Sequence, residues 1–132
     1  MHGVILDAGS FDQNDLITSS LENSLESWHW HRSTLPNQTM ARIADMNVIV
    51  TNKVAINASA LASSSLQLII VAATGTNNID LKEAERKAIS VCNVRDYASP
   101  AVSQHVFSMI LALYTHLSDY ANAVRELSLI HI

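Results

Sequence analysis

The run Leu66-Gln-Leu-Ile-Ile-Val-Ala-Ala73 is the longest strand candidate in the chain and the stretch that decides the fold. Apolar side chains occur at both odd and even positions, so both faces of this strand are expected to be buried. Strands of that kind lie in the middle of parallel sheets that helices cover on both sides. The run therefore predicts an α/β protein built on a parallel sheet.

Shorter apolar runs and helical patterns alternate around this central strand. Strands are predicted at 3–8, 27–31, 47–51, 66–73 and 89–93, and helices at 15–25, 37–46, 59–63 and 80–87. The strand at 27–31 alternates with period two and is expected near an edge of the sheet. Strands separated by helices imply right-handed crossovers, and the pattern predicts a doubly wound, five-stranded parallel sheet.

A long apolar helix is predicted after the fifth strand. Ser99 and Pro100 are typical of a helix start, and apolar residues between Ala101 and Leu117 cover far more than one face. Such a helix must be buried on several sides, against another domain or another subunit. In isolation it would make the chain self-associate or dissolve poorly.

Length and composition exclude several functional classes. The 132 residues are 48% apolar and 15% charged, which suits one buried core, and the net charge of −4 gives no broad basic surface for nucleic acid. The three glycines, Gly3, Gly9 and Gly75, are too far apart for a dinucleotide loop or a P-loop. Cys92 is the one cysteine, so an internal disulfide is excluded, and we expect it to be a small core residue.

No apolar run is long enough to span a bilayer, and no signal segment opens the chain. A soluble, cytoplasmic protein without a membrane partner is therefore expected. His29 and His31 would lie on one face of a strand and resemble half of a metal site, but they lack a third ligand nearby, so we predict no metal.

Ligands of doubly wound sheets bind beyond the carboxyl ends of the strands, so the loops there hold the candidate site. Gly75 follows the central strand, where exposed amides could bind a carboxylate, or it could simply make a tight turn. Lys53 could supply a positive charge or be merely solvated. Arg95 and Tyr97 could hydrogen-bond a polar substrate or pack between domains.

Three stretches in order carry a family resemblance: Val50-Thr-Asn-Lys-Val54, Val71-Ala-Ala-Thr-Gly-Thr-Asn-Asn-Ile-Asp80, and Val91-Cys-Asn-Val-Arg-Asp-Tyr-Ala-Ser-Pro-Ala-Val-Ser-Gln-His-Val106. With the opening Gly3-Val-Ile-Leu-Asp-Ala-Gly9, they resemble the D-isomer-specific 2-hydroxyacid dehydrogenases, in particular the glycerate dehydrogenase and hydroxypyruvate reductase branch. The similarity runs from Met1 to about Arg125.

The resemblance implies a flavodoxin-like substrate domain at 1–98, an interdomain helix that starts a truncated Rossmann domain at 99–125, and a tail at 126–132 that does not follow the family. It implies NAD or NADP as cofactor, a small 2-hydroxy or 2-oxo acid as substrate, and a homodimer. The residues that it assigns to the substrate are Asn52, Lys53, Ala73, Thr74, Gly75 and Tyr97, and Val102 is assigned to the cofactor.

The family's dinucleotide loop and its catalytic Arg, Glu and His match nothing in this chain. The resemblance therefore implies a fragment that has no turnover and binds no cofactor tightly. Ala88 replaces the glycine that is usual in the family before the fifth strand. Because of this replacement, the family resemblance does not fix the backbone geometry at the end of the preceding helix.

Two alternatives remain from the sequence. A signalling receiver domain shares the five-strand plan, but the third strand ends in Thr51-Asn-Lys53 instead of an acidic phospho-acceptor, and Asp7 is alone after the first strand. A non-catalytic carboxylate-binding or dimerisation module would bind a small hydroxy acid without a nucleotide.

Overall fold

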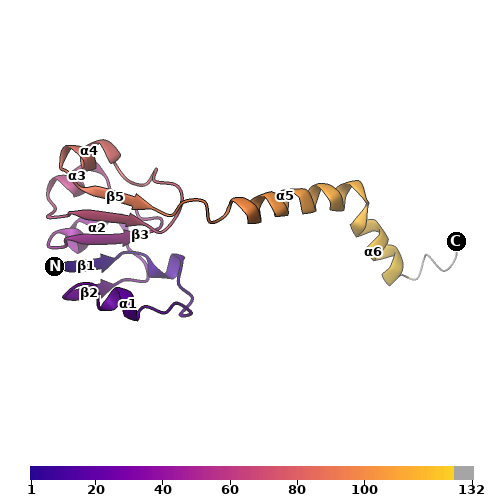
Figure 1. The fold of residues 1–132 in the computed structure, drawn as a ribbon, viewed down its shortest axis with the longest axis horizontal. Coiled ribbons are helices and arrows are strands. Elements are labelled where there is room, and N and C mark those ends of the chain that lie inside the picture. The colour runs from indigo at the N-terminus through magenta and orange to yellow at the C-terminus, as the bar shows by residue number, and fades with distance from the viewer. Residues whose placement is uncertain (127–132) are drawn as a thin grey trace. The chain divides into compact units, whose positions relative to one another are not determined.

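A computed structural model describes residues 1–126 and contains the predicted parallel sheet (Figure 1). The five strands have the order β2-β1-β3-β4-β5, and every neighbouring pair is parallel. Their bounds are β1 His2–Ile5, β2 Ser27–Trp30, β3 Val48–Thr51, β4 Leu68–Val71 and β5 Ser90–Asn93. The predicted α/β class and doubly wound sheet are confirmed, and β2 lies at an edge as expected.

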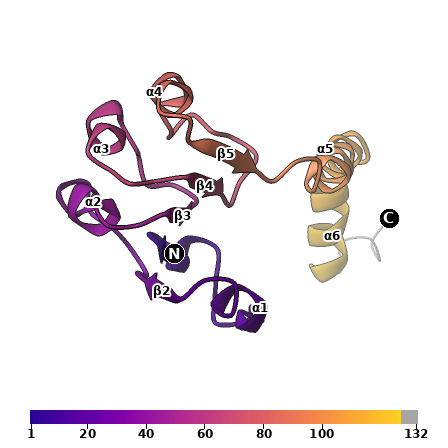
Figure 2. The ribbon, with the colours of Figure 1, turned by 60° about the vertical axis from the view of Figure 1, so that its left-hand side comes forward.

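The crossover helices divide the core into two clusters, one on each face of the sheet (Figure 2). On one face lie α2 (Pro36–Ile43), α3 (Ala58–Ala62) and α4 (Leu81–Arg86), whose Ile43, Leu61 and Ala84 are buried with Ile49 of β3. On the other face Leu21 of α1 (Ser19–Glu22) packs against a smaller cluster. This alternation follows from successive strand residues pointing to opposite faces.

Local signals in the sequence place two of these helices correctly. Pro36 opens α2, where its fixed φ suits the first turn. Asp80 caps α4, because its Oδ1 accepts a hydrogen bond from the Glu83 amide at 3.0 Å. After α4 the chain turns through Ala88 with φ of 55°, the left-handed conformation in which a glycine avoids a steric cost.

The helix predicted at 15–25 is reduced to the four residues of α1. Asp12 prevents an earlier start, because its Oδ1 accepts hydrogen bonds from the amides of Asn14 (2.8 Å) and Asp15 (3.2 Å). Asn14 itself has φ of 67°. A carboxylate that binds nearby amides offers the backbone an alternative to the helix.

The predictions for β4 and β5 are partly wrong. The central run forms a strand only at 68–71, and of its side chains Ile69 and Val71 are buried whereas Leu68 and Ile70 are half-buried. Cys92 is exposed on the edge strand β5 and is not a core residue. An edge strand has a neighbour on one side only, so it buries less.

A second compact unit begins at Asp96, three residues before the expected boundary. It contains α5 (Ser99–Tyr114) and α6 (Leu117–Arg125). As predicted, the helix begins at Ser99 and Pro100, and Ala98 occupies the capping position without a side-chain hydrogen bond. His116, with φ of 53°, ends the predicted long helix and separates α6, which the sequence reasoning missed. The apolar side chains of α5 are exposed, Phe107 at 65% and Leu113 at 78%.

The expected tail at 126–132 lies outside the described residues except for Glu126. Within the described part of the chain, no helix combines the length and the apolar character that crossing a bilayer requires.

Candidate functional site

The loops that follow β1, β3, β4 and β5 meet at one edge of the sheet, because all the strands are parallel. Hydrogen bonds continue the pairing beyond the strands. The Ala72 amide donates to the Thr51 carbonyl (2.8 Å), and the Val94 amide donates to the Ala73 carbonyl (3.1 Å). The structure thus brings the predicted residues Asn52 and Lys53 to the same edge as 73–75.

The loop after β4 offers hydrogen-bond donors and few free acceptors. Asn93 Nδ2 donates to the Thr74 carbonyl at 2.7 Å, and the Ala73 carbonyl accepts from Val94. Within residues 1–126, no hydrogen bond uses the backbone N–H of Thr74 or Gly75, and both residues are exposed. Free amides of neighbouring residues are a ready site for an anion.

Gly75 is not required by the turn itself. Its φ lies outside the left-handed region, and an added Cβ would meet only Asn77 Oδ1, at 3.2 Å. Gly9 differs, because a Cβ there would stand 2.9 Å from the Arg32 carbonyl oxygen. The absence of a side chain at Gly75 leaves the face of the loop open to a ligand.

Asp7 organises the loop after β3 and is the residue that sequence reasoning left out of the site. Its side chain accepts hydrogen bonds from the Thr51 hydroxyl (3.0 Å) and from the amides of Asn52 (3.0 Å) and Lys53 (2.7 Å). Asp7 is only 6% exposed. An acidic residue two positions after a buried strand was the available signal, since a buried carboxylate needs several donors.

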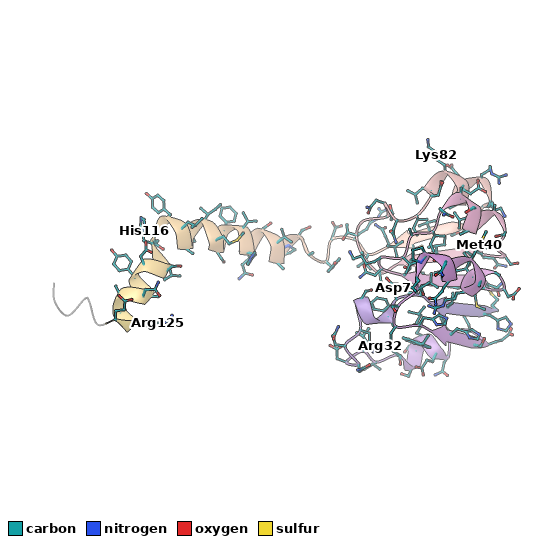
Figure 3. The ribbon with its side chains drawn as sticks, turned by 180° about the vertical axis from the view of Figure 1, so that it is seen from behind. Asp7, Arg32, Met40, Lys82, His116 and Arg125 are labelled. Carbon is teal, nitrogen blue, oxygen red and sulfur yellow. The ribbon has the colours of Figure 1, made fainter. Side chains whose placement is uncertain are left out.

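A pocket of about 710 Å³ lies beside this loop, and we call it the basic pocket. It is formed between the ends of β1 and β3 and the helices α2 and α3. Of the predicted site residues, only Lys53 lines it, and the lining otherwise includes Asp7, Arg32, Thr34, Met40 and Asn57. Figure 3 labels three of the lining residues, Asp7, Arg32 and Met40, and also Lys82 of α4, which does not line the pocket.

Two of the remaining predicted residues, Tyr97 and Val102, belong to the second unit. Tyr97 is 64% exposed and Val102, in the first turns of α5, is 58% exposed. Arg95, the last residue of the first unit, has its Nε 3.5 Å from Asn93 Oδ1.

His29 of β2 and His31, which follows the strand, have no further metal ligand beside them in the described residues. There, no group of three or more His, Cys, Asp or Glu side chains is arranged to hold a metal ion. Burial lowers the pKa of His31, and the positive charges of Arg42 and His29 lower it further.

The chain is similar to known dehydrogenases over most of its length. The family described as "D-isomer specific 2-hydroxyacid dehydrogenase, catalytic domain" matches residues 8–127. A glycerate dehydrogenase of Methylorubrum extorquens is 37% identical over 92 residues, which are 69% of this chain and 29% of that protein. A hydroxypyruvate reductase of Blautia hydrogenotrophica is 27% identical over 126 residues, 93% of this chain and 39% of that protein.

The fold is also that of solved enzyme structures. A D-lactate dehydrogenase of Aquifex aeolicus, solved with NAD and lactic acid, has a TM-score of 0.72 at 22% identity, covering 96% of this chain and 38% of its own. The chain therefore spans well under half of the length of the relatives it matches.

Proposed function

The chain belongs to the D-isomer specific 2-hydroxyacid dehydrogenase family, and on that premise we propose that it forms the organic-acid-binding part of an oxidoreductase. The reaction is hydride transfer between NAD(H) or NADP(H) and carbon 2 of a small acid of the hydroxypyruvate and D-glycerate type. In the reducing direction the carbonyl gains a hydride at carbon and a proton at oxygen. Membership of this family replaces the receiver-domain alternative.

The described residues do not fit a dinucleotide by themselves. Gly3, Gly9 and Gly75 lie in three separate segments, and none forms a glycine-rich loop at a helix start. We therefore assign to this chain the binding and orientation of the acid and derive no hydride step within it. Val102 stays a proposed cofactor contact from the family resemblance.

The observation that supports this role is the pair of unused amides at Thr74 and Gly75. In the proposal these two N–H groups donate to the substrate carboxylate, and Lys53 adds a positive charge from the neighbouring loop. Asp7 holds the backbone of that loop in place. Asn52, Ala73 and Tyr97 complete the proposed contacts with the acid.

Titration of the ¹⁵N-labelled chain with D-glycerate tests the proposal by NMR. We expect the amide signals of Thr74, Gly75 and Thr76 to shift with saturation. An affinity on the order of millimolar is sufficient, because two charge-assisted hydrogen bonds supply about 4 kcal/mol. Saturable shifts elsewhere, with these three signals unmoved, would refute the assignment.

A non-catalytic carboxylate-binding module remains a second candidate, because the amides at Thr74 and Gly75 bind an acid without help from a nucleotide loop. The absorbance of NADH with hydroxypyruvate distinguishes the two functions when measured on the full-length protein. We expect oxidation there and none with the 132 residues alone. A full-length protein that binds D-glycerate but never oxidises NADH would favour the module.

We also propose a cytoplasmic homodimer in which α5 is covered. The exposed apolar side chains of α5, among them Phe107, Ile110 and Leu113, support an association through this helix.

A further inference from the structure

The basic pocket gathers positive charge in a chain whose net charge is −4. Arg32 and Lys53 line it, and Arg42 reaches its wall, where the guanidinium donates to the Ser33 carbonyl at 2.7 Å and to the Thr34 hydroxyl. Among residues 1–126, no salt bridge involves any of these three cations. Arg32 Nη1 donates to Asn14 Oδ1 at 3.1 Å, which is an uncharged partner, so the charges of Arg32 and Lys53 are not paired with a carboxylate.

The one carboxylate in the lining is already committed. Asp7 accepts from the Thr51 hydroxyl and from two backbone amides, and Ser10 Oγ lies 3.3 Å from its Oδ2. These donors stabilise the carboxylate without using any cationic side chain. The lining therefore holds two cationic side chains, Arg32 and Lys53, against the one carboxylate of Asp7, and no salt bridge in residues 1–126 joins them.

The walls also suit the organic part of a ligand. Met40, Val54 and Ala60 supply apolar surface, whereas Thr34, Asn57 and Ser59 supply polar groups. A volume of about 710 Å³ lies within the usual range for small-molecule sites, about 300–1,000 Å³. A three-carbon acid would fill only a small part of it.

We propose that the basic pocket is a second binding site, for the phosphate group of a small organic phosphate monoester, separate from the amides at Thr74 and Gly75. Arg32 presents the donors that Asn14 leaves unused to the phosphate oxygens, and Lys53, the one residue that the two proposed sites share, contributes a point charge. The apolar wall at Met40 contacts the organic group. The site does not depend on the proposed dehydrogenase function.

NMR titration of the full 132-residue chain at low ionic strength tests this site, with inorganic phosphate and butyl phosphate as probes. We expect both to shift the amide signals of Ser10, Arg32 and Ser59, and butyl phosphate to bind several-fold more tightly because of its apolar chain. Affinity should fall between low salt and 0.15 M salt, since the pocket is partly open to solvent. Absence of saturable shifts at these amides would overturn the proposal, as would butyl phosphate binding no tighter than phosphate.

Two variants of equal charge change provide the control. Arg32→Gln should weaken binding roughly fivefold, because it removes one partly exposed charged donor. Lys82→Gln removes a positive charge from α4, none of whose residues lines the pocket, and should leave the affinity unchanged. Equal weakening by both variants would indicate unspecific charge attraction and overturn the site.

A third variant separates this site from the proposed function. Gly75→Ala should abolish D-glycerate binding and leave butyl phosphate binding intact. Loss of both ligands in folded Gly75→Ala would refute a separate pocket, whereas a chain that binds butyl phosphate but never D-glycerate would refute only the proposed function.

Discussion

We expect the substitution Gly75→Ala to weaken the binding of the acid while leaving the stability of the fold almost unchanged. The backbone at Gly75 does not occupy the left-handed region, and the added methyl group would meet only the side-chain oxygen of Asn77, at 3.2 Å. At compatible positions this substitution stabilises a protein by about 0.4–1 kcal/mol, because it restricts the unfolded chain. Since Asn77 is exposed and can move aside, we expect the free energy of unfolding to change by less than about 1 kcal/mol.

The same methyl group should interfere with the carboxylate. Hydrogen bonds to a charged group contribute about 1.5–3 kcal/mol each, so losing the two amides costs about 3 kcal/mol or more. That corresponds to an affinity reduced more than about hundredfold. The measurements are the melting temperature of the variant and NMR titration with D-glycerate.

Gly9→Ala is the matched control. Here the methyl group would stand 2.9 Å from the Arg32 carbonyl oxygen, which already accepts from the Gly9 amide at 3.0 Å. Overpacking of this kind costs about 1–3 kcal/mol, so this variant should melt at a lower temperature. Unchanged D-glycerate affinity in folded Gly75→Ala would refute the role of the amides. A loss of stability in Gly75→Ala as large as that in Gly9→Ala would refute the open space described around Gly75.

Four further predictions concern other parts of the chain. Asp7→Asn should lower the free energy of unfolding by about 1.5–3 kcal/mol in urea, because amides held by a carboxylate lose a charged partner; an unchanged midpoint would contradict this. Ala88→Gly should raise it by about 0.5–1 kcal/mol, since glycine relieves the left-handed strain; a lower melting temperature would disprove that. The pKa of His31 is depressed in the folded state, so as the pH falls the unfolded chain takes up this proton first, and the free energy of unfolding decreases below about pH 6.5. His31→Gln should therefore reduce the decrease in the free energy of unfolding measured between pH 7.5 and 5.5. An identical decrease in the variant would argue against this linkage. Replacing Phe107 and Ile110 by Ser should lower the mass found by light scattering, and a parent chain that is already monomeric would exclude association through α5.

The sheet and the starts of α2 and α4 could be predicted, because they depend on the spacing of apolar residues and on local backbone and capping chemistry. The run at 66–73 contains an internal strand, and Pro36 and Asp80 mark helix starts by backbone geometry and by capping. The Gly75 loop was also identified, because a glycine after a central parallel strand lies at the carboxyl edge whatever the details of packing.

The features that were missed depend on contacts between distant or competing groups. Asp12 binds amides that a helix at 15–25 would have used, and the apolar spacing gives no sign of that competition. His116 adopts a left-handed conformation, which the presence of a histidine in the sequence does not predict. The role of Asp7 depends on Asn52, which lies 45 residues away in the sequence. Periodicity alone therefore could not reveal that carboxylate as part of the site.

The exposed thiol on β5 makes this protein convenient for spectroscopy. Because Cys92 is the one cysteine among 132 residues, a maleimide dye or a nitroxide would attach at a single known place without any engineered substitution. Its strand forms the rim of the sheet next to β4, whose Leu68 and Ile70 are only half-buried. A fluorophore there would change its emission whenever another polypeptide covers that rim, and so would report on assembly in real time.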